Sequence, residues 1–371
     1  MKTPTTPFQP CVIIDSGAFS AYHLGKPIEL EAYMAWLKRL VSRPSVVPIE
    51  FVNLDVLDAA RDTGQESYNN WLRLRAEGLD PLPVWHLHTD VKWLKKYLKK
   101  TDHLSISISG NEDRSRLGRL RCFDRIWEEY LIDKDRKPAV RVHGMGMTSF
   151  SLMQRYPWFS VDSATYLRQA IYGKLHLPRP MVDGSWDYRH TYILSVSFAS
   201  PMNARKDQHF NTLGQKQQDM LTRYVKECGF EWGESRKGDD GEEVVVKPGI
   251  VNNYNQRLYL NMLCFSRSIH AYPWPRPLTV SSSGLFSVPE QGVTESRLTP
   301  EILKAYRYTR LYYSGGEGAG IEDFIRERPE EFENCGVMLT YYTQQAEGIA
   351  ARRLKALRRG EHSPMKGAKE E

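Results

Sequence analysis

Short apolar segments alternate with amphipathic helical patterns through the first two-thirds of the chain. The β-branched run at 11–15 ends in a turn signal, and apolar residues then recur at helical spacing from 30 to 41. The same alternation continues as far as residue 198. It predicts strands at 49–56, 82–88, 103–109, 139–144, 158–163 and 191–198, and helices at 65–78, 91–98 and 115–131. Thr148 and Ser149 are placed to cap a further short helix.

Six or seven β-then-α units in series predict a parallel sheet with right-handed crossovers, either a barrel or an open doubly wound sheet. Polar residues at the end of nearly every strand favour the barrel, because barrel active sites gather at that edge. These residues are Asp15, Asp55, His86 or His88, Ser107 to Ser109, His143 and Asp162. No Gly-x-Gly-x-x-Gly follows the first strand, which argues against a dinucleotide site. The predicted fold class is α/β, a (β/α)8 TIM-type barrel with a C-terminal extension.

The domain organisation follows from where this pattern loosens. We expect a barrel domain over 1–275, with polar insertions near 202–218 and 231–249 and a helix at 254–269. We expect a C-terminal extension over 276–371, packed on the barrel. It would contain elements at 301–312, 321–328 and 339–359, and its tail at 360–371 is expected to be disordered.

Composition narrows the class of protein. The 371 residues are 41% hydrophobic, yet no apolar run approaches the roughly 18–20 residues of a membrane span. The first residues lack the apolar stretch of a signal peptide, so we expect a cytoplasmic protein (in the host cytoplasm if a phage encodes it). Its five cysteines are scattered without Cys-x-x-Cys spacing, which predicts reduced thiols and no metal site. Residues distant in sequence can still converge on zinc, and that alternative stays open.

The net charge of +6 is a mild bias toward polyanions. Five lysines between 92 and 100 read as a solvated helix face. A second basic group lies at 352–359, and this segment and the loop at 202–218 are candidates for holding a nucleic-acid backbone.

Three strand-end aspartates carry the candidate chemistry. Taken singly, Asp15, Asp55 and Asp162 could each be a turn or helix-capping residue. Around one rim, their mutual repulsion would raise the pKa of at least one above about 3.9, leaving one carboxyl protonated and another ionised. That division suits a nucleophile paired with an acid/base. After the fifth strand, the glycines of His-Gly-Met-Gly-Met-Thr-Ser (143–149) would let the backbone approach a ligand closely.

The order of these motifs resembles the tRNA-guanine transglycosylases over about residues 11–175. They are Asp-Ser-Gly-Ala-Phe (15–19), Asn-Leu-Asp (53–55), a strand ending in His, His-Gly-Met-Gly-Met-Thr (143–148) and Ser-Val-Asp-Ser (160–163). Family members are barrel enzymes that exchange guanine in a nucleic acid for a 7-deazaguanine. The chain is closer to the phage and bacterial branch that performs this exchange in DNA.

The resemblance implies a role for each matching residue. Asp162 would be the nucleophile that attacks the sugar, and Asp15 the acid/base. Asp55 would accept hydrogen bonds from the purine's Watson–Crick edge, where guanine presents two adjacent donors. The remaining residues would contact the base: Phe19 and His143 as a sandwich, His86 and Ser107 at its edges, and Gly144 through the close approach of its backbone.

The chain departs from the family after the nucleophile. The family carries Cys-x-Cys-x-x-Cys and a later His that bind structural zinc, whereas 190–270 here has only Cys228 and Cys264. That region helps the family to grip tRNA, so its loss favours DNA, with the target base flipped out of a duplex.

The sequence therefore predicts an enzyme, a DNA guanine transglycosylase that exchanges guanine for a 7-deazaguanine such as 7-cyano-7-deazaguanine. The double displacement would pass through a covalent glycosyl ester on Asp162, as in retaining glycosidases, and requires no cofactor. Its partners would be DNA and the free base, with no membrane. The alternatives are the same chemistry on tRNA, a retaining glycoside hydrolase on a barrel scaffold, and a binding module without activity. The oligomeric state and the DNA sequence context stay open.

Overall fold

The computed structural model divides the chain into two compact units, residues 1–163 with 273–371, and residues 164–272. It describes residues 10–42, 49–58, 60–108, 116–147, 149–200, 209–272, 278, 296–305, 309–314 and 320–341.

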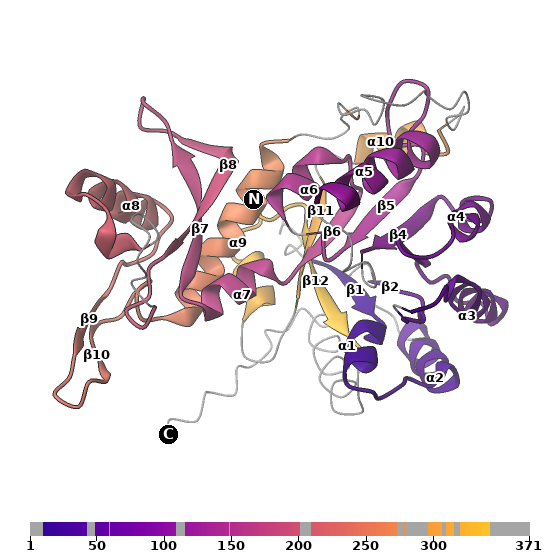
Figure 1. Ribbon diagram of the computed structural model, residues 1–371, viewed down its shortest axis with the longest axis horizontal. Coiled ribbons are helices and arrows are strands. Elements are labelled where there is room, and N and C mark those ends of the chain that lie inside the picture. The colour runs from indigo at the N-terminus through magenta and orange to yellow at the C-terminus, as the bar shows by residue number, and fades with distance from the viewer. Residues whose placement is uncertain are drawn as a thin grey trace, which may run out of the picture. The chain divides into compact units, whose positions relative to one another are not determined.

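The first unit is built on a sheet of eight parallel strands in the order β2-β1-β12-β11-β6-β5-β4-β3 (Figure 1). The strands are β1 (Cys11–Asp15), β2 (Ile49–Phe51), β3 (Val84–His86), β4 (His103–Ser107), β5 (Arg141–Met145), β6 (Ser160–Ser163), β11 (Arg310–Ser314) and β12 (Cys335–Thr340). Neighbouring strands run in the same direction throughout. All carboxyl ends therefore lie along one edge.

The sheet curls so that its two outer strands are linked by backbone hydrogen bonds. Val52, just after β2, bridges Leu82, just before β3. The amide of Asn53 donates to Leu82 O at 2.8 Å, and the amide of Leu82 donates to Phe51 O at 2.8 Å. Buried side chains such as Ile13, Val84 and Tyr312 fill the core. This large, curled parallel sheet is consistent with a TIM-like α/β fold, as the sequence predicts.

Helices follow the strands, and those predicted near 30–41, 65–78, 91–98 and 115–131 are confirmed, whereas the short helix after β1 was not predicted. They are α1 (Ala18–His23), α2 (Leu30–Val41), α3 (Gly64–Ala76), α4 (Val91–Leu98), α5 (Arg116–Ile126) continued by the π-helical turn η1 (Trp127–Leu131), α6 (Phe150–Arg155), α10 (Pro300–Ala305) and α11 (Ile321–Arg326). In α2 the helical stripe of Tyr33, Trp36 and Leu37 is buried, as its spacing predicts. Ser149 caps α6, because its Oγ accepts from the amide of Leu152. Thr148 lies outside the described residues.

The seventh predicted strand is confirmed as a strand over 191–195, but its expected place in the parallel sheet is wrong. Residues 186–195 form β8 (Trp186–Ser195), which pairs antiparallel with β7 (Lys174–Pro180) in the second unit. The strands beside β6 and β1 in the eight-stranded sheet are instead β11 and β12, which the sequence assigned to a C-terminal extension. An apolar run predicts a strand but carries no information about its pairing partner, and most side chains of β8 are at least partly exposed.

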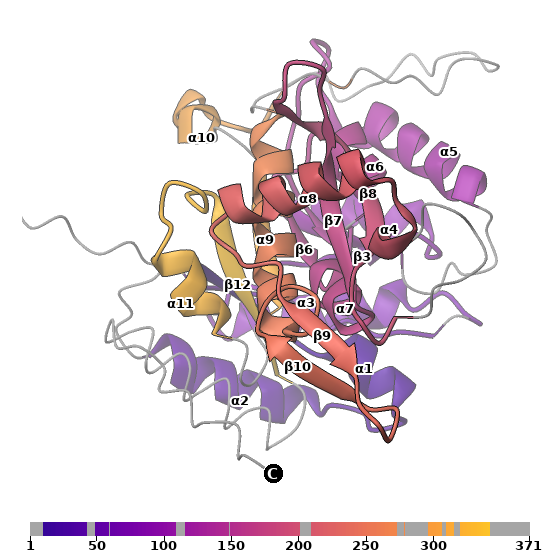
Figure 2. The same cartoon turned by 90° about the vertical axis from the view of Figure 1, so that its left-hand side faces the viewer.

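The second unit combines the β7–β8 pair with three helices and a hairpin. Helices α7 (Thr165–Ile171), α8 (Gln215–Glu227) and α9 (Tyr254–His270) accompany the short 3-10 helix η2 (Phe210–Thr212) and the strands β9 (Glu234–Lys237) and β10 (Glu243–Lys247). Figure 2 shows α9 running alongside β7. The Asn261 side chain ties α9 to this layer, since Oδ1 accepts from the His176 amide at 2.7 Å and Nδ2 donates to Tyr166 O.

Several loop predictions are corrected here. The segment 202–218 is not a loop throughout, because α8 begins at Gln215, while 201–208 lie outside the described residues. The connection at 231–249 contains the β9–β10 hairpin. Helix 254–269 is confirmed, whereas the predicted element at 301–312 is a short helix followed by β11. The basic segment 352–359 and the tail 360–371 lie outside the described residues.

Candidate functional site

The predicted polar residues gather at the carboxyl edge of the parallel sheet. Asp15 ends β1, His86 ends β3, Ser107 ends β4 and Asp162 lies near the end of β6. Because all eight strands run in the same direction, the side chains at their carboxyl ends share one rim. This is the edge at which barrel enzymes place their chemistry.

Asp15 is fixed by the turn that joins β1 to α1. Gly17 has φ 81°, a left-handed conformation that favours glycine, and a Cβ there would lie 2.2 Å from Tyr341 O. On the other side, the amide of Tyr341 donates to Asp15 O at 2.8 Å. The turn is thus held by the segment after β12, and any side chain at position 17 would force the backbone to move.

The pKa of the Asp15 carboxyl is raised to about 7, so this group exchanges its proton near neutrality. Burial is the largest cause, followed by the negative charges of Asp55 and Asp162, while hydrogen bonds from the amides of Ser16 and Gly17 oppose the rise. The sequence predicted such a shift from mutual repulsion. The direction is confirmed, and the three carboxyls lie close enough to influence one another, but desolvation outweighs repulsion.

Asp55 is held by two neighbours at the same rim. Its Oδ2 lies 2.7 Å from Nε2 of His86, and its Oδ1 accepts from the Ser16 hydroxyl at 3.4 Å. The His86 ring is buried, and its Nδ1 has no hydrogen-bond partner within the described part of the chain. His86 therefore orients Asp55 directly, a contact that the predicted role against the base did not include.

Asp162 receives a hydrogen bond from the loop after β5. The amide of Gly146 donates to its Oδ1 at 2.6 Å, and Nε2 of His143 lies 3.5 Å from the same oxygen. Nδ1 of His143 is 2.8 Å from the Ser160 hydroxyl, which fixes the ring. His143 is fully buried. Its position suits orienting Asp162, whereas a sandwich against a base would need an open face of the ring.

The remaining predicted residues differ in their surroundings. Phe19 on α1 is 51% exposed and packs against the ring of His23 in an edge-to-face arrangement, so much of its surface remains accessible. Ser107 is buried at the end of β4, and its carbonyl accepts from the Leu87 amide. At Gly144 a Cβ would lie 2.6 Å from the Met147 side chain. Packing under the loop therefore explains this glycine without any ligand.

Three residues of this rim were missed by sequence reasoning: Ser16, Gly146 and Ser160. Gly146 belongs to the Gly-Met-Gly part of the 143–149 motif. Its φ of 64° is a left-handed conformation that favours glycine, so the glycine itself was the only sequence feature that could have indicated this position. The two serines are common residues. Their importance depends on which side chain lies opposite, and the sequence does not record that.

A cavity of about 410 Å³ lies at the other end of the same strands. It is lined by Glu50 of β2 and by the first residues of β4 and β5, His103 and Arg141. These are amino ends, so this cavity is separate from the carboxyl-edge rim.

The two cysteines of the second unit lie near each other, close enough for the Cys228 sulfur to contribute to the raised pKa of Cys264, although burial is the larger cause. Arg267 donates to Cys228 Sγ at 3.3 Å and to the Tyr188 hydroxyl at 2.9 Å. A guanidinium beside a thiol opposes a cation at that place. No group of three or more His, Cys, Asp or Glu suited to a metal occurs within the described ranges.

Chemically, the rim offers one carboxyl that holds or releases a proton near pH 7 and a second that is anchored by a backbone amide. Two carboxyls in these different states are the groups that nucleophilic substitution with proton transfer requires. Comparison of the chain with family models, with curated proteins and with solved structures finds no match. Within its described residues, no helix is long and apolar enough to cross a membrane.

Proposed function

We propose that this chain is a DNA guanine transglycosylase built on a complete (β/α)8 barrel, which exchanges guanine for a 7-deazaguanine base. The observation that carries the proposal is the meeting of Asp15, Asp55 and Asp162 at one strand edge, with the pKa of Asp15 raised to about 7. The motif order described above supplies the substrate class.

In the first step, a carboxylate oxygen of Asp162 attacks C1′ of the deoxyribose. The bond from C1′ to the guanine nitrogen breaks, and the leaving base takes the proton of the Asp15 carboxyl. The products are a glycosyl ester on Asp162 and an ionised Asp15. The amide of Gly146 holds the attacking carboxylate in place, and the 51% exposed Phe19 ring offers a stacking surface for the base.

In the second step, Asp15 takes a proton from the incoming deazaguanine, whose nitrogen attacks C1′ and displaces Asp162. Two inversions leave the new base on the original face of the sugar. Asp55, oriented by His86, would accept hydrogen bonds from the purine's donors. Water must stay out while the ester exists, because hydrolysis would leave an abasic site.

The choice of DNA over tRNA rests on the second unit. Only two cysteines are present between 190 and 270, and Arg267 lies against one of them. This arrangement does not fit the zinc-binding subdomain that the tRNA enzymes use. A duplex substrate would need its guanosine flipped into the rim, at a cost of a few kcal/mol.

The test is to trap the covalent intermediate. The protein is incubated with guanine-containing duplex DNA, single-stranded DNA or tRNA, with and without 7-cyano-7-deazaguanine, and denatured adducts are identified by mass spectrometry. We expect an adduct with DNA that disappears in Asp162→Asn and Asp162→Ala. Asp80→Asn serves as control, since this exposed residue lines the cavity at the amino ends of the strands.

Each other outcome has a definite meaning. Absence of an adduct on every polymer, with a folded protein, would reject the proposal. An adduct on tRNA alone would assign the same chemistry to tRNA, and release of sugar from simple glycosides without an adduct on nucleic acid would identify a glycoside hydrolase.

A further inference from the structure

Helix α4 presents a dense row of cations on its outer face. Lys92, Lys95, Lys96, Lys99 and Lys100 lie on this helix or directly after it, and all five are exposed. The opposite face of α4, with Trp93, Leu94 and Tyr97, is buried inside the first unit.

Within the part of the chain that the structure describes, few carboxylates compensate this charge, and the nearest, Asp90, interacts with Lys92 and with Lys95. Lys92 pairs with Asp90 at 3.4 Å, but no described carboxylate lies within 4 Å of the other four lysines. Neighbouring α3 differs, because its Arg73 pairs with Glu77 and Glu31. Surface charges of opposite sign are ordinarily interspersed, so a single-sign row is a feature that needs an explanation.

The stability of α4 does not provide that explanation. Cations at a helix C-terminus are favourable because they interact with the last carbonyls. Here Arg75 donates to Lys100 O at 3.5 Å, and Arg297 donates to Leu98 O and Thr101 O. Two arginines from elsewhere in the chain already fill this role.

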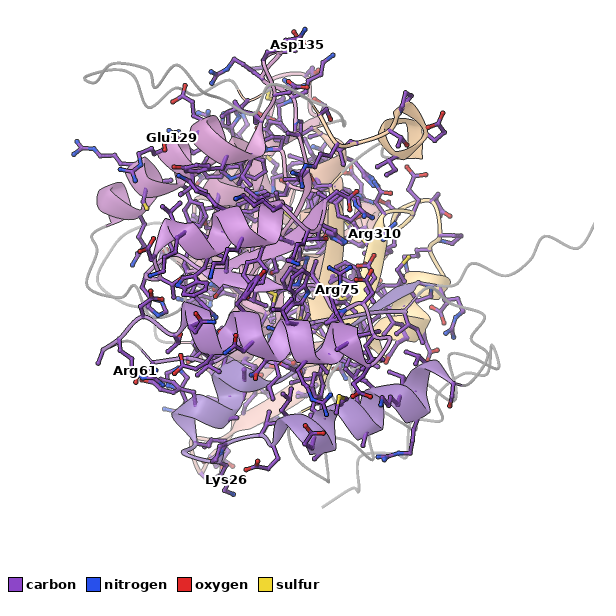
Figure 3. The ribbon with its side chains drawn as sticks, turned by 90° about the vertical axis from the view of Figure 1, so that its right-hand side faces the viewer. Lys26, Arg61, Arg75, Glu129, Asp135 and Arg310 are labelled. Carbon is purple, nitrogen blue, oxygen red and sulfur yellow. The ribbon has the colours of Figure 1, made fainter. Side chains whose placement is uncertain are left out.

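Helix α5 adds one cation to this surface, whereas its continuation η1 carries Glu128 and Glu129 and no basic residue. The Lys95 ammonium lies 5.2 Å from the ring of Tyr130 in η1, which places the two elements side by side. Arg121 of α5 is exposed, and it too has no carboxylate partner within the described residues. Figure 3 looks onto the outer helices of this unit, where the labelled Arg75 lies on α3 and the labelled Arg61 lies just before it. We call α4 with Arg121 the lysine face.

Several of these cations are held over aromatic rings. Lys96 lies 4.0 Å from the ring centre of Trp93 and 5.3 Å from that of Tyr68. Both rings are buried, so they orient charge without being open to stacking. A surface of fixed cations without exposed rings can bind phosphates but cannot read bases.

The lysine face also lies near the candidate site along the chain. Helix α4 begins only a few residues after His86, which ends β3 at the rim. At about 1.5 Å per residue the row is roughly 12 Å long. One DNA strand advances about 3.4 Å per phosphate, so three to four phosphates match this length.

We propose that the lysine face binds the phosphate backbone of the DNA substrate, independently of sequence. The inference rests on the proposed function for the identity of the polymer. An anionic membrane is the less suitable partner, because helices that bind membranes insert an apolar face, and the apolar face of α4 is packed inside the protein.

The test compares two triple variants of the full chain with the same charge change. Lys95→Gln/Lys96→Gln/Lys99→Gln neutralises the face. The control, Lys216→Gln/Lys226→Gln/Lys237→Gln, removes three exposed lysines of the second unit. Binding to a fluorescein-labelled duplex is followed by fluorescence anisotropy between about 50 and 200 mM KCl, and circular dichroism verifies folding.

We expect the face variant to bind DNA at least tenfold more weakly at the lower salt concentration. The slope of log K against log salt should fall by about 2 to 3, since each lost phosphate contact removes about 0.9. The control should keep a slope within one unit of wild type. Equal slopes for wild type and the face variant, both folded, would overturn the inference.

Adduct formation separates this inference from the proposed function. Wild-type binding that depends on the lysine face, without any adduct, would retain the inference and reject the enzyme. An adduct that the face variant forms as well as the wild type would support the proposed enzyme and reject the role of the lysine face. A face variant that loses binding only to vesicles containing phosphatidylserine, and not to DNA, would reassign the surface to a membrane.

Discussion

The backbone amide of Gly146 donates a 2.6 Å hydrogen bond to Oδ1 of Asp162, so the loop after β5 holds the side chain at the end of β6. His143, which lies on β5 three residues earlier, approaches the same oxygen at 3.5 Å. Its ring is fixed in turn by the hydroxyl of Ser160. The proposed nucleophile is thus oriented by a chain of contacts that includes only one other predicted site residue.

These contacts around Asp162 predict that Ser160 affects the rate of adduct formation. Ser160→Ala removes the partner of His143 Nδ1 inside the core, which should cost about 1–3 kcal/mol of stability. It should also slow adduct formation, because the ring that faces Asp162 loses its anchor. Single-turnover kinetics under conditions where the protein is fully folded measure the rate. Ser160→Thr retains the hydroxyl and should restore the rate, and failure of this rescue would show that Ser160 acts only through packing.

The raised pKa of Asp15 predicts a pH-dependent stability. The carboxyl titrates at about 7 in the folded protein and at about 3.8 ordinarily. The stability associated with its neutral form is present below pH 4 and is lost as the pH rises to 7. Asp15→Asn cannot ionise, so its stability relative to wild type should increase by roughly 2–4 kcal/mol between pH 4 and pH 8.

Urea unfolding at several pH values measures this difference. Asp183→Asn is the control, because hydrogen bonds from Ser185 lower the pKa of Asp183 and the trend should not appear there. A difference that does not change with pH would mean that folding does not raise the pKa of Asp15. Under the proposed function, loss of the Asp15 proton should also slow release of guanine above about pH 7.

Much of the fold follows from local patterns, and the failures have a common origin. The alternation of strands and helices up to 163 follows from periodicity, because each element buries its own apolar face. The last two strands of the sheet were missed, since the unit at 164–272 separates β6 from β11. The apolar residues of β8 gave a stronger strand pattern than the five residues of β11.

The candidate site also contains residues that the sequence could predict and residues that it could not. Asp15, Asp55 and Asp162 could be predicted because a polar residue at the end of an apolar strand is visible in sequence. The partners of these aspartates could not, because Ser16, His86 and Gly146 act through tertiary hydrogen bonds. For the same reason repulsion was predicted as the cause of the raised pKa of Asp15, whereas burial, which depends on the whole fold, is the larger one.

The conformation of Gly17 predicts a loss of stability when it is replaced by alanine, and Gly25 offers a matched control. Gly17→Ala combines a left-handed φ of 81° with a Cβ only 2.2 Å from Tyr341 O, so the strand-end turn must move. Gly25 has φ 62° but nothing within 4 Å of a Cβ. We expect Gly25→Ala to cost about 1 kcal/mol and Gly17→Ala at least twice that amount. Chemical denaturation measures both, and equal costs would show that the segment after β12 does not press on this turn.

The buried contact between Asp55 and His86 predicts a strong coupling. Both side chains are at most 9% exposed, and their 2.7 Å contact lies away from bulk water. Asp187 and His190 make a contact of 2.6 Å at the surface, where the His190 side chain is 68% exposed. Solvent screening limits exposed pairs to about 0.2–1 kcal/mol, whereas removing one partner of a buried pair leaves a polar group unsatisfied.

Double-mutant cycles with Asp→Asn and His→Gln at each pair give the two coupling energies from denaturant unfolding. We expect about 1–3 kcal/mol for Asp55–His86, and a value for Asp187–His190 at the low end of the surface range. Under the proposed function, His86→Gln should also weaken binding of the free deazaguanine, because Asp55 loses the ring that fixes its orientation. A coupling at the rim no larger than at the surface would show that Asp55 is not held by His86, and the assignment of Asp55 as a preoriented acceptor would then fail.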